Sequence, residues 1–291
     1  MPTFRYLQLD VFPASRGGGN PLGVVVDARG LSTADMQRFA AWTNLVETTF
    51  LLPADDAAAS YRLRIFTPTA EIPFAGHPTV GSAHAALDSG FVRAHEGRLI
   101  QQCGAGLLPI RIEGTGDARE ISVQAPPAQI LREGVEDGSL RAALGFRELG
   151  LLPPAFVEGG RRWWVAELTD ENAVRSWQPN HAAIQGLARA DACLGLCVFA
   201  RCANAGYELV VRAFPAGAGI VEDPASGAAN GLIAAYIAQR EPQGQLARGY
   251  RVSQGREMGH DAAITIRIDA DSAVWVGGRT NTIIDGAVTW M

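Results

Sequence analysis

Residues 223–230 read Asp-Pro-Ala-Ser-Gly-Ala-Ala-Asn and join an apolar, strand-like segment to the small-residue segment 231–238. Aspartate, serine and proline are typical of the first positions of a helix, so the stretch predicts a helix N-terminus. The unpaired N–H groups at such a terminus favour a carboxylate or a phosphate. Two interpretations follow: an anion-binding turn, or a plain helix start that Asp223 caps.

A second segment, in the first half of the chain, repeats this pattern. Residues 75–77 (Ala-Gly-His) also precede an Ala-rich stretch, and they align with residues 226–228 (Ser-Gly-Ala). The strand-like segments that lead into the turns align as well, with Tyr-x-Leu-x-Ile at 61–65 and Tyr-x-Leu-x-Val at 207–211. Two copies separated by roughly half the chain indicate an internal duplication. If the halves face each other, the two helix N-termini meet in one cleft.

Strand-like segments dominate the rest of the chain, and each half contains one Ala-rich segment that is apolar on almost every side. A helix of this kind is expected to be buried. The pattern predicts an α+β fold in which a curved sheet wraps round a central helix, twice. We expect the crossover at residues 125–127 (Ala-Pro-Pro) and a return of the C-terminal strand to the first domain. The predicted domains are residues 1–125 with 280–291, and residues 126–279.

The charge and hydropathy of the chain argue against two classes of partner. The formal net charge of the 291 residues is −5, and lysine and arginine form no cluster. Because binding a nucleic acid requires clustered positive charge, we expect no nucleic-acid partner. No apolar run reaches the length of about 18 residues that a membrane-spanning helix needs. The start of the chain lacks the apolar core of a signal peptide, so we expect a cytoplasmic protein with no membrane partner.

The chain has four cysteines, Cys103, Cys193, Cys197 and Cys202, which we expect to be reduced thiols. The spacing of Cys193 and Cys197 resembles that of a metal site, but both lie in an apolar run that is typical of a buried strand. A zinc site would need histidine or further cysteine nearby. We therefore predict core thiols and no metal site.

Glu47 follows a predicted helix that begins at Ser32 and Asp35, a variant of the capping box. Val46 and Phe50 flank Glu47, so its carboxylate is poorly solvated unless it faces a cleft. Partial desolvation raises the pKa of a glutamate towards the range that is useful for acid–base catalysis. The alternative is a solvated glutamate at a helix end, which is the commoner situation in proteins.

Other ionisable side chains near the two turns are Glu71, His77, Glu222 and Asp223. His77 would begin the first helix, where the helix dipole favours the neutral imidazole. A local cap or a core histidine is equally compatible with its position. Asp223 could accept a hydrogen bond from an amine or a hydroxyl of a substrate. With Glu47 moving the proton, these groups are the ones that a cofactor-free proton-transfer enzyme needs.

Residues 17–21 read Gly-Gly-Gly-Asn-Pro, a composition typical of a flexible loop or turn before the β-branched strand at 22–26. We interpret this segment as a surface turn. The alternative interpretation places it at the rim of the substrate cleft.

Four segments resemble the PhzF, or phenazine biosynthesis-like, family. They are residues 20–24 (Asn-Pro-Leu-Gly-Val), 47–50 (Glu-Thr-Thr-Phe), 74–79 (Phe-Ala-Gly-His-Pro-Thr) and 222–230 (Glu-Asp-Pro-Ala-Ser-Gly-Ala-Ala-Asn). The resemblance covers essentially the whole chain and relates it to the diaminopimelate-epimerase-like superfamily. It implies two pseudo-symmetric domains, each a β-barrel-like sheet wrapped round a central α-helix, with the active site between them.

The same resemblance implies roles for particular residues. Glu47 would be the catalytic acid/base, and the substrate would be bound by His77, Gly76, Asp223, Ser226 and Gly227. The best-known reaction of the family isomerises trans-2,3-dihydro-3-hydroxyanthranilate, and its members are commonly homodimers.

Three features of the sequence refine this implied chemistry. Thiol-dependent epimerases carry one cysteine at each helix-leading turn, where this chain has Ala75 and Ser226, so we do not expect two-cysteine racemisation. Val46 stands where the phenazine enzyme often has a serine that contacts the substrate. His260 and Asp261 replace the Arg-Pro pair that usually follows the motif at residues 254–259.

The sequence therefore predicts a cofactor-independent isomerase of the PhzF type, with no metal, that acts as a homodimer. Its substrate would be a small carboxylate-bearing molecule such as trans-2,3-dihydro-3-hydroxyanthranilate. Two alternatives retain the same fold. One is a non-catalytic protein that binds a small acid, and the other is a dimer that serves as a protein-interaction partner.

Overall fold

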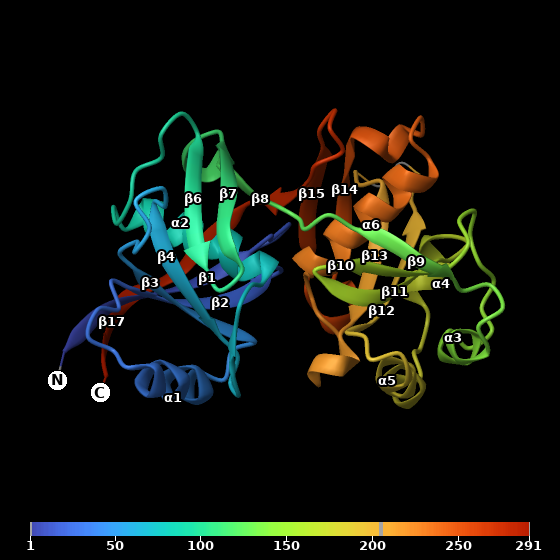
Figure 1. The fold of residues 1–291 in the computed structure, drawn as a ribbon, viewed down its shortest axis with the longest axis horizontal. Helices are drawn as coiled ribbons and strands as arrows, with labels where there is room; N and C mark the ends of the chain where they lie inside the picture. Colours follow the sequence, from blue (N-terminus) through green and yellow to red (C-terminus); the bar gives the residue numbers. More distant parts are fainter. Residues whose placement is uncertain (1, 204–205, 291) are drawn as a thin grey trace. The chain divides into compact units, whose positions relative to one another are not determined.

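A computed structural model of the chain describes residues 2–203 and 206–290, which divide into two compact units (Figure 1). The N-terminal unit comprises Met1–Gln124 and Gly277–Met291, and the C-terminal unit comprises Ala125–Val276. Within the described ranges, every helix falls short of the combined length and apolar character that a membrane crossing demands.

The N-terminal unit is built on one curved sheet. Its strands are β1 (Thr3–Val11), β2 (Asn20–Val26), β3 (Glu47–Leu52), β4 (Tyr61–Phe66), the short β5 (Glu71–Ile72), β6 (Arg98–Cys103), β7 (Gly106–Glu113), β8 (Glu120–Gln124) and β17 (Thr280–Thr289). Their order is β17-β1-β2-β3-β4-β6-β7-β8, with β5 paired to the end of β4. The β2–β3 and β4–β6 pairs are parallel and the others are antiparallel.

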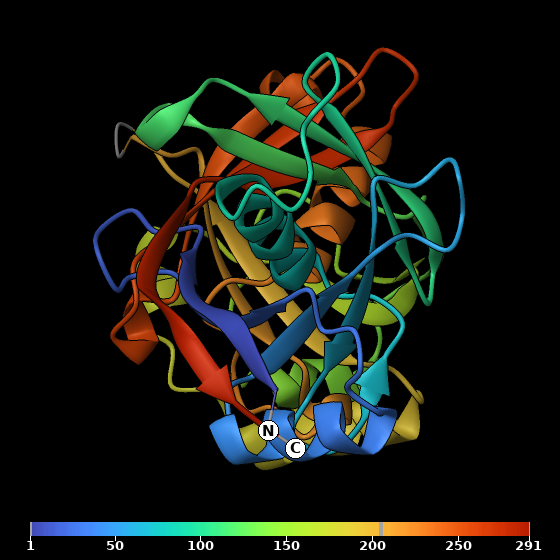
Figure 2. The same ribbon diagram turned by 90° about the vertical axis from the view of Figure 1, so that its left-hand side faces the viewer.

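This sheet encloses the helix α2 (Gly76–Asp88). The helix contacts β1, β2, β3, β4, β8 and β17, and Figure 2 shows these strands surrounding it. Every residue from Gly76 to Ala86 is buried, as the apolar character of the segment predicted. The packing is tight enough that a Cβ atom at Gly81 would lie 2.6 Å from Leu22 Cδ2.

A second helix of this unit, α1 (Thr33–Thr43), packs through Met36, Phe39 and Ala40 against a cluster that includes Phe50 and Phe66. The predicted capping box is present. The Ser32 side chain accepts a hydrogen bond from the Asp35 N–H, and the Asp35 side chain accepts one from the Ser32 N–H.

The C-terminal unit has a comparable sheet and central helix. Its strands are β9 (Gln129–Glu133), β10 (Ala155–Gly159), β11 (Arg161–Glu167), β12 (Gly195–Arg201), β13 (Leu209–Phe214), β14 (Gly249–Gln254) and β15 (Ala262–Ile268), and β16 (Val274–Gly278) runs across the boundary between the units. Its helices are α3 (Gly138–Ala143), α4 (Glu171–Arg175), α5 (His181–Ala190) and α6 (Gly227–Arg240). Nearly all of α6 is buried, and it contacts β10 and β15.

The two sheets repeat one pattern of strand pairing. From β1 to β7 the successive pairs are antiparallel, parallel, antiparallel, parallel and antiparallel, and the same sequence runs from β10 to β15. Each parallel pair is joined by a crossover that contains helix, and the second crossover contains the buried helix, α2 or α6. The prediction that each of two units consists of a sheet wrapped round a central helix is confirmed.

Candidate active site

Glu47 is buried at the start of a strand. It is the first residue of β3, and Leu22 of the neighbouring strand β2 is its partner in the parallel register. The preceding helix α1 already ends at Thr43, and Asn44 adopts the left-handed conformation beyond it. Only 8 % of the residue is exposed. The alternative of a solvated glutamate at a helix end is therefore wrong.

His77 lies beside this carboxylate. It is the second residue of α2, it is 5 % exposed, and its Nε2 atom lies 3.4 Å from Oε2 of Glu47. Burial lowers the pKa of His77 to about 3, so the imidazole is neutral at pH 7. The structure thus brings together two of the predicted residues, a buried carboxylate and a neutral imidazole.

Asn20 completes this cluster and does so from the glycine-rich loop. Its Nδ2 atom lies 3.3 Å from Nδ1 of His77. The loop is held by Asp10, whose carboxylate accepts hydrogen bonds from the N–H groups of Gly17 and Gly19, both at 2.7 Å. Gly18, Gly19 and Asn20 are buried. The interpretation of this loop as a surface turn fits only its exposed start at Gly17 and is wrong for the part from Gly18 to Asn20, where the buried Asp10 binds the backbone.

The first turn of α2 has two backbone N–H groups without a partner among the described residues. Ala75 is the N-cap, and its side chain makes no capping hydrogen bond. Pro78 has no N–H, and the Thr79 N–H donates to the carbonyl of Ala75. The N–H groups of Gly76 and His77 make no hydrogen bond to any residue that the structure describes. This is the donor arrangement that favours an anionic group.

The second predicted turn starts α6 in the same way. Ser226 is the N-cap, and its Oγ accepts from the Ala229 N–H at 3.4 Å. Asp223 does not cap the helix, since its Oδ1 accepts from the Ala225 N–H at 3.2 Å within the preceding turn. The N–H groups of Gly227 and Ala228 have no hydrogen-bond partner among the described residues. The alignment of residues 75–77 with 226–228 is therefore also an alignment of helix starts.

Gln254 holds this second turn together. Its Oε1 accepts from the Ser226 N–H at 3.2 Å and from Asn230 Nδ2 at 2.8 Å, and its Nε2 donates to the Asp223 carbonyl at 2.7 Å. The side chain lies at the end of β14 and is almost fully buried. Sequence reasoning assigned no site role to Asn20, Asp10 or Gln254. The signals were that Asn20 and Gln254 stand in family-like segments, and that one interpretation of residues 17–21 placed them at the rim of the substrate cleft.

Two other predicted candidates are engaged by arginines. Glu71 is paired with Arg64, with a shortest contact of 2.6 Å. Glu222 forms a two-pronged pair with Arg212, at 2.9 Å and 3.0 Å, and both side chains are buried. Arg212 also donates to the carbonyls of Val174 and Trp177. These carboxylates are structural partners of arginine.

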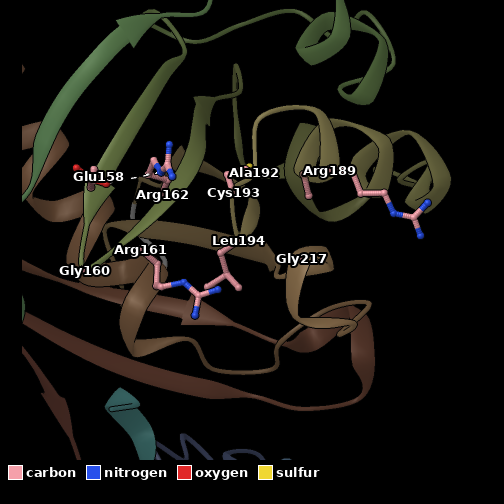
Figure 3. Close-up of a pocket in the computed structure, with 10 residues that line it drawn as sticks. Glu158, Gly160, Arg161, Arg162, Arg189, Ala192, Cys193, Leu194 and Gly217 are labelled. Carbon is pink, nitrogen blue, oxygen red and sulfur yellow. Dashed lines mark ion pairs between the residues drawn. The ribbon is translucent and has the colours of Figure 1, made fainter. Parts of the chain in front are cut away.

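The C-terminal unit also has a pocket of about 420 Å³ (Figure 3). Its lining comes from β10, β11, α5, the segment before β12 and the turn at Gly217, and it includes Arg161, Arg162 and Arg189. Arg162 lies 3.6 Å from Glu158. None of the predicted site residues lines this pocket.

Glu47, His77 and Gly76 thus lie in the N-terminal unit, and Asp223, Ser226 and Gly227 lie in the C-terminal unit. The fold and these residues define a protein of the diaminopimelate-epimerase-like class with a carboxylate–imidazole pair at the start of a buried helix. The sequence profile of the phenazine biosynthesis-like protein family, PhzC-PhzF, matches residues 9–286. The chain belongs to this family.

Individual relatives cover almost the full length. The antisense-enhancing sequence 1 protein of Schizosaccharomyces pombe is 34% identical over 98% of this chain and 99% of its own. The trans-2,3-dihydro-3-hydroxyanthranilate isomerase of Pseudomonas aeruginosa is 32% identical over 97% of this chain and 98% of its own. Uncharacterised isomerases of Pasteurella multocida and Clostridium acetobutylicum also match, at 30% and 27% identity over 96% and 97% of this chain and 92% and 96% of their own. The prediction of an isomerase is confirmed at this level.

Solved structures confirm the fold. The PhzF-family protein of Bacillus anthracis superposes with a TM-score of 0.83 at 24% identity, over 99% of this chain and all of that one. A hydroxyproline epimerase of Agrobacterium vitis superposes with a TM-score of 0.61 at 13% identity, over 98% of this chain and 92% of that one. The predicted epimerase-like architecture therefore extends beyond the family.

Proposed function

We propose that the protein is a cofactor-independent isomerase in which Glu47 moves a proton between two positions of a small carboxylate-bearing substrate. The observation that carries this proposal is the buried contact of 3.4 Å between Glu47 Oε2 and His77 Nε2. The candidate substrate is trans-2,3-dihydro-3-hydroxyanthranilate, because relatives with 32% identity are named for its isomerisation.

The proposed reaction is balanced within one substrate molecule. The ionised carboxylate of Glu47 takes a proton from a carbon atom, the double bond shifts, and the resulting glutamic acid returns a proton to another carbon of the same molecule. Such a transfer moves no electrons to an external acceptor. A positioned acid or base of this kind contributes about 10²–10⁴-fold to a rate.

Substrate binding is assigned to the two helix starts. We expect the N–H groups of Gly76 and His77 to bind an anionic group of the substrate, since they have no partner among the described residues. The neutral imidazole of His77 adds one hydrogen bond. The turn that carries Asp223, Ser226 and Gly227 is expected to contribute further binding, with Asp223 accepting from an amine or hydroxyl group.

The experiment is proton NMR of trans-2,3-dihydro-3-hydroxyanthranilate in deuterated buffer, with the wild type and with Glu47→Gln. We expect the wild type to isomerise the compound with uptake of deuterium, and the variant to lose about 10²–10⁴-fold in rate. Binding measured by calorimetry should change little, because the amide keeps the size of the carboxylate.

Three results would contradict parts of the proposal. Equal rates for the wild type and Glu47→Gln would remove Glu47 from the mechanism. A wild type that binds the compound without turnover would favour a small-acid binding protein. A wild type that neither binds nor converts it would exclude this substrate, and the same assay would then be run with other small amino and hydroxy acids.

A further inference from the structure

We propose that Asn20 is a positioning residue that fixes the tautomer of His77, so that the imidazole proton is on Nε2, the ring nitrogen that lies beside the carboxylate of Glu47. The tautomer is a property of the resting protein. Only its catalytic consequence rests on the proposed function.

The hydrogen-bonding capacity of the two side chains dictates the tautomer. A neutral imidazole carries its single proton on one ring nitrogen, and the other nitrogen is an acceptor. The amide nitrogen of asparagine is a donor, and Nδ2 of Asn20 lies 3.3 Å from Nδ1 of His77. Nδ1 therefore accepts, and the proton resides on Nε2, the atom that lies 3.4 Å from Glu47 Oε2. The orientation of this contact is not that of a hydrogen bond, so the two groups interact through charge and dipole.

The backbone that carries Asn20 is fixed by its neighbours. Asp10 accepts the N–H groups of Gly17 and Gly19 at 2.7 Å each, so a buried carboxylate closes the loop directly before Asn20. A Cβ atom at Gly19 would lie 2.3 Å from the carbonyl oxygen of Val11, which leaves no room for another residue. Asn20 itself is paired with Val11 in the β1–β2 register and is fully buried.

The tautomer decides which protonation state of Glu47 is favoured. A proton on the ring nitrogen that lies 3.4 Å from the carboxylate oxygen stabilises the ionised form of Glu47 by electrostatic attraction, and the ionised form is the one that acts as a base. The opposite tautomer would direct a lone pair at the carboxylate oxygens and would favour the protonated acid. Asn20 thus selects the resting state in which Glu47 is ready to accept a proton.

The test is a long-range ¹H–¹⁵N NMR spectrum of the full chain labelled with ¹⁵N-histidine, recorded without substrate at neutral pH. The chain has five histidines, and the His77 signals are those that His77→Gln removes. We expect a protonated Nε2 and an unprotonated Nδ1 in the wild type. Asn20→Asp replaces the donor by an acceptor of similar shape and should transfer the proton to Nδ1.

A matched control distinguishes a change in the His77 tautomer from the general effect of a substitution in the buried interior. Ser82→Ala removes a buried hydrogen bond of 2.8 Å to Thr49 in the same unit and should leave the His77 signals unchanged. A wild type with its proton on Nδ1, or one with the same tautomer mixture as Asn20→Ala, would overturn the proposal. The wild-type spectrum decides this even where a variant fails to fold.

A kinetic comparison tests the consequence. In Asn20→Ala, kcat for the isomerisation should fall about 10²-fold while KM stays nearly constant, because the misplaced group acts only on the chemical step. If Ser82→Ala lost as much in kcat, the effect of Asn20→Ala would be explained by a structural role of Asn20. A correct tautomer in a protein without isomerase activity would contradict only the proposed function.

Discussion

The imidazole of His77 makes the free energy of unfolding of the protein depend on pH. A histidine of an unfolded chain has a pKa near 6.5, and burial lowers the pKa of His77 to about 3. Between these values the unfolded chain binds one proton more than the folded chain. The free energy of unfolding therefore falls as the pH falls, by up to about 1.4 kcal/mol per pH unit from this group.

We predict that His77→Gln will flatten this dependence. The glutamine side chain cannot be protonated, so the free energy of unfolding of the variant should decrease less between about pH 6 and pH 4 than that of the wild type. Urea unfolding at a series of pH values measures both slopes. Parallel slopes would mean that His77 titrates alike in the folded and unfolded chains.

Single residues differ in how far the sequence reveals them. The Ser32–Asp35 capping box could be predicted because all its atoms lie within one turn of chain. The burial of Glu47 could not, because it depends on the pairing of β3 with β2 and on the enclosed helix. Asp10 occupies an ordinary position in an alternating strand, and only the folded loop shows what its carboxylate accepts.

The turn before α6 shows how one side chain from a distant strand stabilises a helix start. Gln254 satisfies the Ser226 N–H, the Asp223 carbonyl and the Asn230 amide from the end of β14. The N–H groups of Gly227 and Ala228 find no partner in the part of the chain that the structure describes. The turn therefore keeps open donors while its other polar groups are fixed.

We predict that Gln254→Leu will destabilise the protein by about 1–3 kcal/mol, because it leaves buried polar groups without partners. Under the proposed function it should also raise KM more than it lowers kcat. The control is Gln239→Leu, which removes one exposed hydrogen bond to the Ala128 carbonyl and should cost less than about 1 kcal/mol. Chemical denaturation compares the two variants, and equal costs would contradict the role of Gln254.

The Arg212–Glu222 pair fixes the strand that leads into this turn. The side chains are 5% and 9% exposed, and Arg212 also lies 5.2 Å from the centre of the Phe214 ring. We predict that Arg212→Met will cost about 3–5 kcal/mol, because it leaves the Glu222 carboxylate buried without a counter-charge.

The double variant Arg212→Met/Glu222→Gln provides the control. It removes the uncompensated charge and should recover part of the lost stability, although the Val174 and Trp177 carbonyls still lack their donor. A double-mutant cycle from urea unfolding measures the coupling. If the free-energy costs of the two substitutions were strictly additive, Arg212 and Glu222 would not be an interacting buried pair.

The repetition of strands and helices in the two units could be predicted from the sequence, but some individual elements could not. The aligned Tyr-x-Leu-x-Ile segment lies in β4, and the Tyr-x-Leu-x-Val segment enters β13 from Leu209 onward; the two are the equivalent strands of the two sheets. The short helix α4 (Glu171–Arg175) was missed, since five residues carry too little periodicity to distinguish a helix. Strand β9 was missed because its side chains are mostly exposed and show no alternation.

At the scale of the whole molecule, the last strand of the chain belongs to the first unit. Strand β17 pairs with β1 from Thr3–Thr289 to Val11–Thr280, and it also contacts the enclosed helix α2. Arg5 and Asp285 join the two strands through contacts of 2.8 Å and 3.0 Å. The N-terminal unit therefore requires residues that are synthesised after the entire C-terminal unit.

We predict that a chain truncated after Gly278 will lose the fold of its N-terminal unit and keep that of its C-terminal unit. Without β17, the β1 strand loses every hydrogen bond on that side, and the aromatic contact of Trp290 with Phe39 is lost as well. Limited proteolysis followed by mass spectrometry should find cleavage within residues 2–124 and protection within Ala125–Val276. Full-length Trp290→Ala separates the two contributions, because it removes the ring contact and retains the strand. Protection of residues 2–124 in the truncated chain would show that β1 to β8 enclose α2 without help, and that β17 is an addition to a sheet already stable.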